Sequence, residues 1–437
     1  MKSNSFSIKN LNTYVASFFT LIFLFFFLLR FSWIQEFLLN FAENIVLHAS
    51  LNHEAWKERF NEISALPFIL PLAFVIFFAK FFTSYFSGNV KNSFLNLLRC
   101  VACLMVYMFH AFDFTASRCT NLLDKNYMRI FHPSGGGGVC IFFMLGGYLA
   151  GKGFLEGRYS FSIKDIFRYY KNKFFKVIVP TFSFIFLCCV LLYPSFIKDN
   201  PTALLKFLTF SYNGDPSANG FGSLWYIFSL APLYLLTPLF SLAAKKASDK
   251  KARLAFLMIL LFALGFLYRF LVFRLAGGNK LIIYTPFFAN IDLFFCGICL
   301  NGIPKLFSTA PLHDRRTKDF SLFALILFII LCAFYVNIFF YQVLCPSIYI
   351  LLTGLCILSY SDEEWVKSYN GRLEKVIAFF SGISFEFYLF HLLVLYRILP
   401  VFKYQNCVPL HFKYLAIGFT LTFILAFGFH KTFEKKK

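Results

Sequence analysis

Long apolar runs alternate with short polar connections along most of the chain. Spanning a bilayer as an α-helix takes about 20 mostly apolar residues. By that criterion the sequence predicts twelve spans, centred on residues 12–32, 66–86, 94–114, 137–155, 174–196, 222–244, 254–276, 280–301, 319–340, 343–361, 377–398 and 412–431. We therefore expect an all-α fold, a polytopic transmembrane helix bundle.

The composition supports this prediction. Hydrophobic residues make up 59% of the 437 residues and charged residues only 14%. Soluble domains carry about 25% charged residues, so the composition argues against a soluble globular fold. A disordered chain is excluded as well, because it would leave far too much apolar surface in water.

The charges are unevenly distributed. The chain has 42 Lys and Arg against 21 Asp and Glu, a net charge of +21. On a soluble protein this surplus would indicate nucleic-acid binding, but in an apolar chain it is typical of cytoplasmic loops. Basic residues concentrate in alternate connections, at 152–173, 245–253 and 302–318, and at the C-terminal end; the connection 114–136 is the exception. The pattern predicts both termini in the cytoplasm, membrane lipid as a partner and no nucleic-acid partner.

Two Cys-x-x-Cys pairs, Cys100 with Cys103 and Cys296 with Cys299, have the spacing of a zinc or redox site. Both pairs lie inside strongly apolar predicted helices, where Cys behaves as a small apolar residue. A buried thiol without polar surroundings is inert. We therefore predict no metal site.

Ionisable side chains inside a predicted span are costly and by default mark a functional site. The span 94–114 contains three, Arg99, His110 and Asp113. An eleven-residue separation returns Arg99 and His110 to within roughly 20° of the same helix face, about 16.5 Å apart along the axis. Asp113 follows His110 by three residues, where it can orient the imidazole or raise its basicity. The alternative is structural: Arg99 reaches lipid phosphates and His110 bonds to a neighbouring helix.

An Arg, ten intervening residues and a His on the first helix of a ten-helix core resemble the membrane-bound acyltransferase-3 family. Its members are O-acyltransferases that modify bacterial surface glycans. Further segments follow in the family's order. Residues 138–149 resemble its FF-x-L-S-G-F-L segment, 171–180 its R-x-x-R-I-x-P segment, 222–227 its G-x-L-W-F-L segment, 290–297 a polar-to-glycine stretch, and 381–391 its G-x-x-S-Y-x-x-Y-L-x-H segment.

The chain departs from the family's pattern at several positions. Gly146 stands where Ser is usual, and Ser223 where many members have His. Lys173 and Lys176 replace an arginine pair, and Lys binds phosphate as a point charge rather than through a two-pronged contact.

The resemblance covers residues 94–431 and divides the chain into two parts. Residues 1–93 form an N-terminal extension with two predicted spans and an outer loop, and residues 94–437 form the ten-helix core with a short basic tail. The resemblance implies a multi-pass protein of the bacterial cytoplasmic (inner) membrane.

The resemblance also implies a reaction. Acetyl-CoA would donate an acetyl group from the cytoplasm, and a cell-surface polysaccharide or its lipid-linked precursor would accept it on the outer side. His110 is the best candidate for the general base, since imidazole titrates near neutral pH. Asp113 would hold its tautomer, and Arg99 would bind a donor phosphate or stabilise charge on the transferring group.

A second group of basic residues suits the phosphates of the nucleotide. Arg168, Lys173 and Lys176 lie in or beside the basic connection 152–173. The alternative is topology alone, because cytoplasmic loops carry such charges without any ligand.

Two polar and aromatic clusters are candidates for lining the same cavity. His391, with Tyr388 and Ser384 one and two turns earlier, would act as a donor or second relay, and a structural role remains equally open. Trp225 and Tyr226 would either stack on a sugar or belong to the aromatic belt of the membrane.

Two further features have mainly structural interpretations. The carboxylate of Asp292 lies inside a predicted span and is expected to pair with Arg269 or another core cation. The glycine run 135–138 is not a phosphate loop, because no Gly-Lys-Ser/Thr follows it. It is expected to let the backbone bend or pack closely.

Two other functions compete with the acyltransferase. A multi-pass transporter or flippase of lipid-linked sugars has the same number of spans, but neither repeated halves nor broken helices in matching positions are visible. A structural scaffold leaves the shared helix face of Arg99, His110 and Asp113 unexplained.

Overall fold

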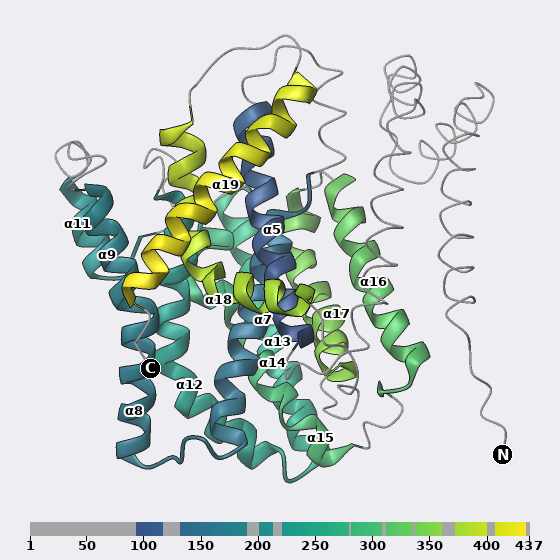
Figure 1. Ribbon diagram of the computed structural model, residues 1–437. Helices are drawn as coiled ribbons and strands as arrows, with labels where there is room; N and C mark the ends of the chain where they lie inside the picture. The colour runs from purple at the N-terminus through teal and green to yellow at the C-terminus, as the bar shows by residue number, and fades with distance from the viewer. Residues whose placement is uncertain are drawn as a thin grey trace, which may run out of the picture. The chain divides into compact units, whose positions relative to one another are not determined.

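A computed structural model describes residues 93–116, 132–189, 201–212, 221–278, 281–307, 312–334, 338–360, 372–399 and 407–433. The chain divides into two compact units, Met1–Gly88 and Asn89–Lys437, and every described residue belongs to the second. These residues form helices and no strand, which confirms the predicted all-α class (Figure 1). The predicted spans 12–32 and 66–86 lie outside the described residues.

Seven helical stretches of the described part are long and apolar enough to cross a membrane. They lie in α5 (Ser93–Ala116), α7 (Gly135–Leu155), η4 with α12 (Gly222–Leu224, Trp225–Ala247), α13 (Lys251–Ala276), η8 with α17 (Phe340–Leu344, Cys345–Ser359), α18 with η10 (Arg372–Leu393, Val394–Ile398) and α19 (Cys407–Phe433). Each coincides with a predicted span. The protein is therefore a polytopic helix bundle.

Two other predicted spans correspond to helices as well. The span 174–196 begins with η2 (Phe174–Ile178) and α9 (Val179–Leu187), which continue directly from α8 (Ile163–Lys173). The span 319–340 corresponds to α16 (Arg315–Phe334). Two shorter helices, α11 (Pro201–Leu208) and α15 (Ile303–Leu306), complete the described elements outside the predicted spans.

The predicted span 280–301 is not one continuous helix. It consists of η5 (Leu281–Ile283), η6 (Phe287–Asn290) and the ten-residue α14 (Ile291–Leu300). Pro286 lies at the break, with extended backbone angles. Proline disfavours helical geometry in the residue before it, so the segment bends here and α14 starts late. Tyr284 and Asn290, on either side of the bend, line the cavity described below.

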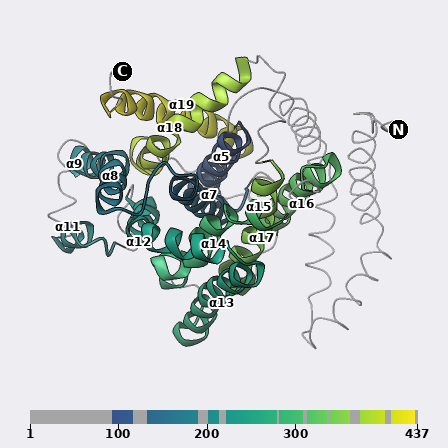
Figure 2. The same ribbon diagram turned by 90° about the horizontal axis from the view of Figure 1, so that it is seen from below.

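The centre of the bundle is α7, which packs against α5, α14 and α17 (Figures 1 and 2). Glycine allows the closest of these contacts. A Cβ at Gly147 would overlap the carbonyl oxygen of Phe294 on α14, and one at Gly297 would overlap that of Met144 on α7. Small residues at such positions let helix backbones approach, which is how transmembrane helices gain packing energy in lipid.

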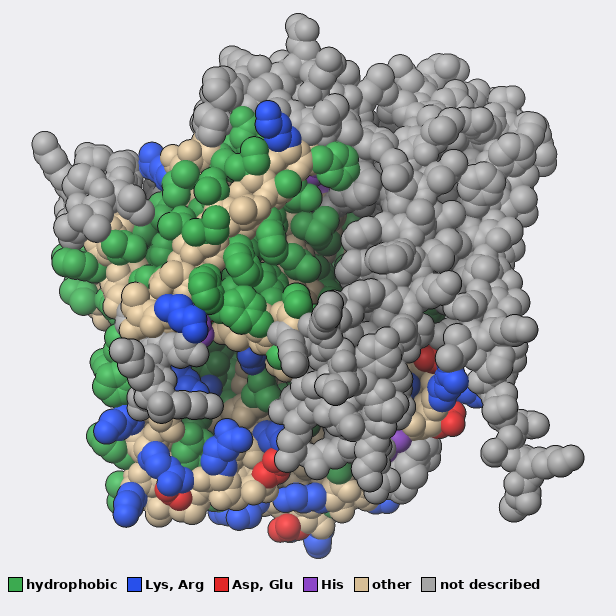
Figure 3. Space-filling model, viewed as in Figure 1, with side chains coloured by type: hydrophobic (Ala, Val, Ile, Leu, Met, Phe, Trp, Pro, Cys, Tyr) green, Lys and Arg blue, Asp and Glu red, His purple; other side chains and the backbone are tan. Residues whose placement is uncertain are grey.

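The outer helices present apolar side chains to their surroundings. Only 17% of the most apolar window of α13 and 22% of that of α19 is buried inside the protein. Figure 3 shows apolar side chains over the face formed by α19, with Lys and Arg gathered below this face, along the bottom of the view. A helix that is apolar on its exposed side as well as its buried side is typical of a membrane span. The arrangement is that of an integral membrane protein.

Candidate active site

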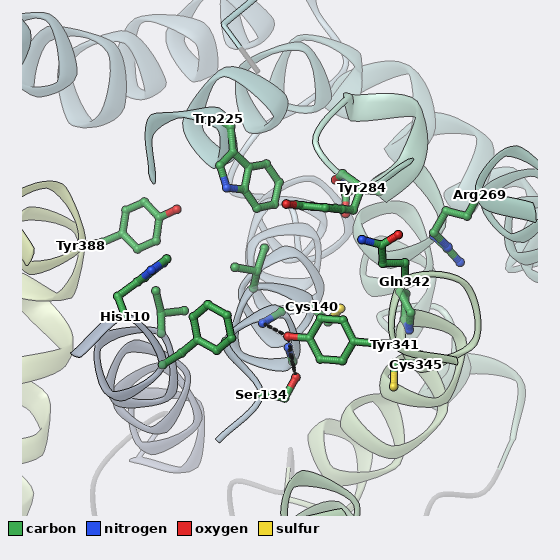
Figure 4. A pocket seen from close by; sticks show the side chains of 18 residues that line it. His110, Ser134, Cys140, Trp225, Arg269, Tyr284, Tyr341, Gln342, Cys345 and Tyr388 are labelled. Carbon is green, nitrogen blue, oxygen red and sulfur yellow. Dashed lines mark hydrogen bonds between the residues drawn. The ribbon is translucent and has the colours of Figure 1, made fainter. Parts of the chain in front are cut away.

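A cavity of about 160 Å³ lies between α5, α7, α12 and η8 (Figure 4). Polar and aromatic side chains from segments far apart in the sequence line this cavity. They are His110, Ser134, Trp225, Arg269, Tyr284, Asn290, Tyr341, Gln342 and Tyr388. Figure 4 shows His110 and Tyr388 on one side of the cavity, and Gln342 and Arg269 on the other. The tertiary structure thus gathers three predicted site residues, His110, Trp225 and Tyr388.

His110 meets a second histidine behind the cavity wall. The ring centroids of His110 and His391 lie 5.3 Å apart. The Nδ1 atom of His391 is 2.6 Å from the carbonyl oxygen of Tyr388. A carbonyl oxygen only accepts hydrogen bonds, so Nδ1 carries the proton and Nε2 carries the lone pair. His391 is 1% exposed, and its Nε2 has no hydrogen-bond partner among the described residues. His391 thus lies beside His110, but it is not among the residues that line the cavity.

Asp113 lies beside a different histidine from the one expected. Its carboxylate is 4.0 Å from Nε2 of His132, and its side chain is 46% exposed. Within the described part of the chain, Asp113 makes no hydrogen bond to His110. His132 also packs against the rings of Phe109 and Phe112, at centroid distances of 4.6 and 4.3 Å. No pattern in the sequence singles out His132, because it lies in a connection and packing decides its neighbours.

The remaining predicted substrate residues divide between the cavity and the core. Tyr388 lines the cavity, and its hydroxyl donates to the carbonyl oxygen of Ser223 at 2.7 Å. Trp225 also lines the cavity. Tyr226 is instead buried against Phe143 and Tyr388, with ring centroids 4.7 and 5.3 Å away. Ser384 donates to the carbonyl of the preceding helical turn and is not part of the cavity lining.

The other end of α5 carries a group of cations. Lys173 sits with its Nζ 3.7 Å from the ring centroid of Tyr234. Burial together with the charges of Lys176 and Arg99 lowers the pKa of Lys173 to about 7. The charges of Lys176 and Arg99 thus act on Lys173, and a nearby anion would favour its charged form. Lys173 precedes the predicted span 174–196.

Arg168 is engaged separately. Its guanidinium forms an ion pair with Asp165 at 3.1 Å and donates to the carbonyl oxygen of Arg158 at 2.7 Å. It also lies 5.2 Å from the ring centroid of Tyr159. Exposed ion pairs of this kind contribute about 0–1 kcal/mol to stability. Arg168 therefore belongs to the exposed surface of α8, whereas Lys173 is half-buried.

A buried ion pair supports the wall opposite His110. Arg269 contacts both carboxylate oxygens of Asp292, at 2.9 and 2.6 Å, and donates to the carbonyl of Ala289 at 2.6 Å. Both side chains are almost fully buried, and the absence of a Cβ at Gly265 makes room for the carboxylate. The expected pairing of Asp292 with Arg269 is confirmed.

The glycine run 135–138 forms the first turn of α7, and its first three residues line the cavity. A Cβ at Gly137 would overlap the hydroxyl of Tyr349, and one at Gly138 would press on the carbonyl of Ala102. The close packing expected for this run is confirmed. Among the described residues there is no cluster of three or more His, Cys, Asp or Glu that could hold a metal ion.

The fold and the site together describe a helical membrane protein with paired histidines at an internal cavity. The family model of the acyltransferase domain matches residues 92–431, more than three quarters of the chain. The protein therefore belongs to the acyltransferase-3 family and is a membrane acyltransferase. No curated protein and no solved structure matches the chain.

Proposed function

We propose that this acyltransferase moves an acetyl group from acetyl-CoA to a hydroxyl of a cell-surface polysaccharide or of its lipid-linked precursor. The observation that carries the proposal is the arrangement along α5. Arg99 joins Lys173 and Lys176 at one end, while His110 and His391 meet at a cavity near the other. One helix thus links a site for an anion with a site for proton transfer.

The cationic end suits the phosphates of coenzyme A. Three positive charges near one another favour a polyanion, and an Arg contact with phosphate is stronger than a neutral hydrogen bond. The predicted orientation places this end at the cytoplasm, where acetyl-CoA is made. Arg99 and His110 are about 16.5 Å apart along the axis, a separation that the extended pantetheine arm of the donor would bridge.

The cavity end suits the chemistry. His110 would accept the proton of the acceptor hydroxyl as its oxygen attacks the thioester carbonyl. The tetrahedral intermediate then collapses, the C–S bond breaks, and the proton on His110 passes to the sulfur of the departing coenzyme A. The lone pair on His391 Nε2 would stabilise His110 while it carries the proton. A base positioned in this way contributes typically about 10²–10⁴-fold to the rate.

The test uses the full-length protein in lipid nanodiscs, with labelled acetyl-CoA and de-O-acetylated surface glycan from a strain lacking the gene. We expect label to enter the glycan as an ester, with an acetyl mass increment. His110→Gln should abolish transfer. His313→Gln is the matched control, because His313 contacts the carbonyl of Ser359 outside the cavity.

Two results would contradict the proposal. Full activity of His110→Gln in a normally inserted protein would exclude His110 as the base. Movement of a lipid-linked sugar across the membrane without any acyl donor would favour the alternative function, a transporter or flippase.

A further inference from the structure

The hydroxyl of Tyr341 lies beside the first turn of α7, on the cavity wall away from His110 (Figure 4). The phenol oxygen accepts a hydrogen bond from the N–H of Gly136 at 2.9 Å and another from the hydroxyl of Ser134 at 3.2 Å. Ser134 in turn accepts from the N–H of Gly137 at 2.9 Å. Both lone pairs of the Tyr341 oxygen are therefore in use, and its own proton has no acceptor among the described residues.

The direction of these bonds makes Tyr341 a strong donor. The chain of donors begins at the N-terminus of a 21-residue helix, where the helix dipole is positive. Hydrogen bonds in such a chain polarise one another, so each donor strengthens the next. The last donor is the Tyr341 O–H, and the space beside it is the cavity.

Aromatic rings face the same space. Trp225 and Tyr284 line the cavity and contact each other edge to face, with ring centroids 5.5 Å apart and planes at 80°. Gln342 adds a largely buried amide to the wall. Apolar ring faces with a few fixed polar groups are typical of a small-molecule site. In particular they fit a sugar, whose C–H face is apolar and whose edge carries oxygens.

The volume limits what can bind. An apolar cavity of about 150 Å³ holds one benzene ring. The cavity here is about 160 Å³, enough for one six-membered ring and too small for the nucleotide of an acyl donor. The phosphate-bearing part of the donor must therefore remain outside this cavity.

We propose that this wall is the acceptor subsite, which takes a single pyranose ring of the glycan. The ring lies against Trp225, the Tyr341 O–H donates to one of its oxygens, and another hydroxyl faces His110. The role of His110 rests on the proposed function above, whereas sugar binding by this wall does not.

The first experiment measures binding without any acyl donor. Methyl glycosides of the sugars found in the isolated surface glycan are tested against the full-length protein in nanodiscs by saturation-transfer NMR. We expect binding by the wild type, about fivefold to tenfold weaker binding by Tyr341→Phe, which corresponds to one lost hydrogen bond, and a greater loss with Trp225→Leu. Tyr170→Phe is the matched control, because its hydroxyl donates to the carbonyl of Leu235 outside the cavity.

The second experiment separates the two substrates. Tyr341→Phe should raise KM for the de-O-acetylated glycan about fivefold to tenfold and leave KM for acetyl-CoA unchanged. A fall in kcat and in acceptor-independent hydrolysis of acetyl-CoA, with glycan KM unchanged, would assign the Tyr341 proton to the acyl carbonyl and overturn the proposal. Unchanged binding and kinetics in Tyr341→Phe would overturn it too.

Further results distinguish failure of the acceptor subsite from failure of the proposed function. If Tyr341→Phe does not insert, Ser134→Ala interrupts the same chain of donors one step earlier and should weaken glycoside binding in the same direction. If the wild type binds the glycosides but transfers no acetyl group, the acceptor subsite stands and the proposed function fails. Absence of glycoside binding in the wild type would contradict the subsite itself.

Discussion

The two ends of α5 differ in how they carry polar chemistry inside a membrane protein. Near Arg99 the side chains are cationic, and aromatic rings contact them, as the Tyr234 ring contacts the Nζ of Lys173. Near His110 the polar groups are an imidazole pair, a phenol and backbone N–H groups around a small cavity. The charged side chain on that cavity wall, Arg269, is neutralised by Asp292.

The difference follows from the cost of charge in a low-dielectric medium. A charged side chain at the centre of a bilayer costs about 2.5–3.5 kcal/mol on insertion scales, and less near the interface. Cations that form no ion pair with a described residue are therefore tolerated at the end of the helix, whereas the groups described around the cavity are neutral or paired. The proposed function assigns the anionic donor and the neutral acceptor to opposite ends of one helix for the same reason. Four predictions test this division.

The largest effect is expected at the neutral end. His110→Gln should lower kcat by about 10²–10⁴-fold and leave KM for acetyl-CoA unchanged, because a general base acts in the transition state and does not hold the donor. Steady-state kinetics with labelled acetyl-CoA measure both constants. If KM for acetyl-CoA rose by the same factor as kcat fell, His110 would be assigned to donor binding. The two ends of α5 would then no longer differ in function.

The buried pair behind the cavity should matter mainly for stability. Asp292→Asn leaves the buried Arg269 charge uncompensated, at a cost of about 3–5 kcal/mol in free energy of unfolding. Thermal unfolding in detergent measures the loss, with the exposed Asp249→Asn as control. The double variant Arg269→Leu, Asp292→Leu should recover part of it, because no unpaired charge remains. A double variant as unstable as the single one would show that the pair itself, and not the orphaned charge, supports this wall.

At the cationic end the expected effect is on donor binding. Arg99→Gln should raise KM for acetyl-CoA by about tenfold to a hundredfold with little change in kcat, since a charged hydrogen bond to phosphate is worth about 1.5–3 kcal/mol. Arg168→Gln is the comparison, because Arg168 is engaged with Asp165 on the surface of α8. It should change the donor KM by about twofold or less. Equal effects of the two substitutions would extend the donor site over the exposed loop.

The smallest effect concerns pH. The pKa of Lys173 is lowered to about 7 by burial and by Lys176 and Arg99, so Lys173 is charged below pH 7 and neutral above it. Attraction for donor phosphates should therefore weaken as pH rises through 7, raising KM for acetyl-CoA by about fivefold to tenfold. Lys173→Arg should remove this dependence, because Arg stays protonated. The exposed Lys171→Arg serves as control, and a pH profile unchanged by Lys173→Arg would separate Lys173 from the donor.

Much of this arrangement could be predicted from local pattern. The same-face relation of Arg99 and His110 needs only a continuous helix, and α5 runs unbroken from Ser93 to Ala116. The pairing of Arg269 with Asp292 follows from the cost of leaving either charge alone in an apolar bundle. In both cases the physical rule acts within one helix or on one charge, so distant packing does not alter it.

Other features depended on how helices meet. Trp225 and Tyr226 are neighbours in sequence and about 100° apart around a helix, so only the position of α12 decides that Trp225 faces the cavity and Tyr226 the core. Asp113 lies near His132 because the segment before α7 returns to α5 there. Pro286 is visible in the sequence, but the apolar run around it is long enough to predict a single span over 280–301. The structure shows that the helix breaks at Pro286.

The amino-acid sequence by itself determined the class of protein, the seven membrane spans found among the described residues and the helix face that carries Arg99 and His110, because hydropathy and helix period are local properties. The tertiary structure alone decided which polar groups share the cavity. Tyr341 illustrates this: in a chain with 23 Tyr residues it carries no distinguishing motif, and its proposed role depends on the first turn of α7 packing against η8. That contact joins residues 205 positions apart, so only the folded chain can bring them together.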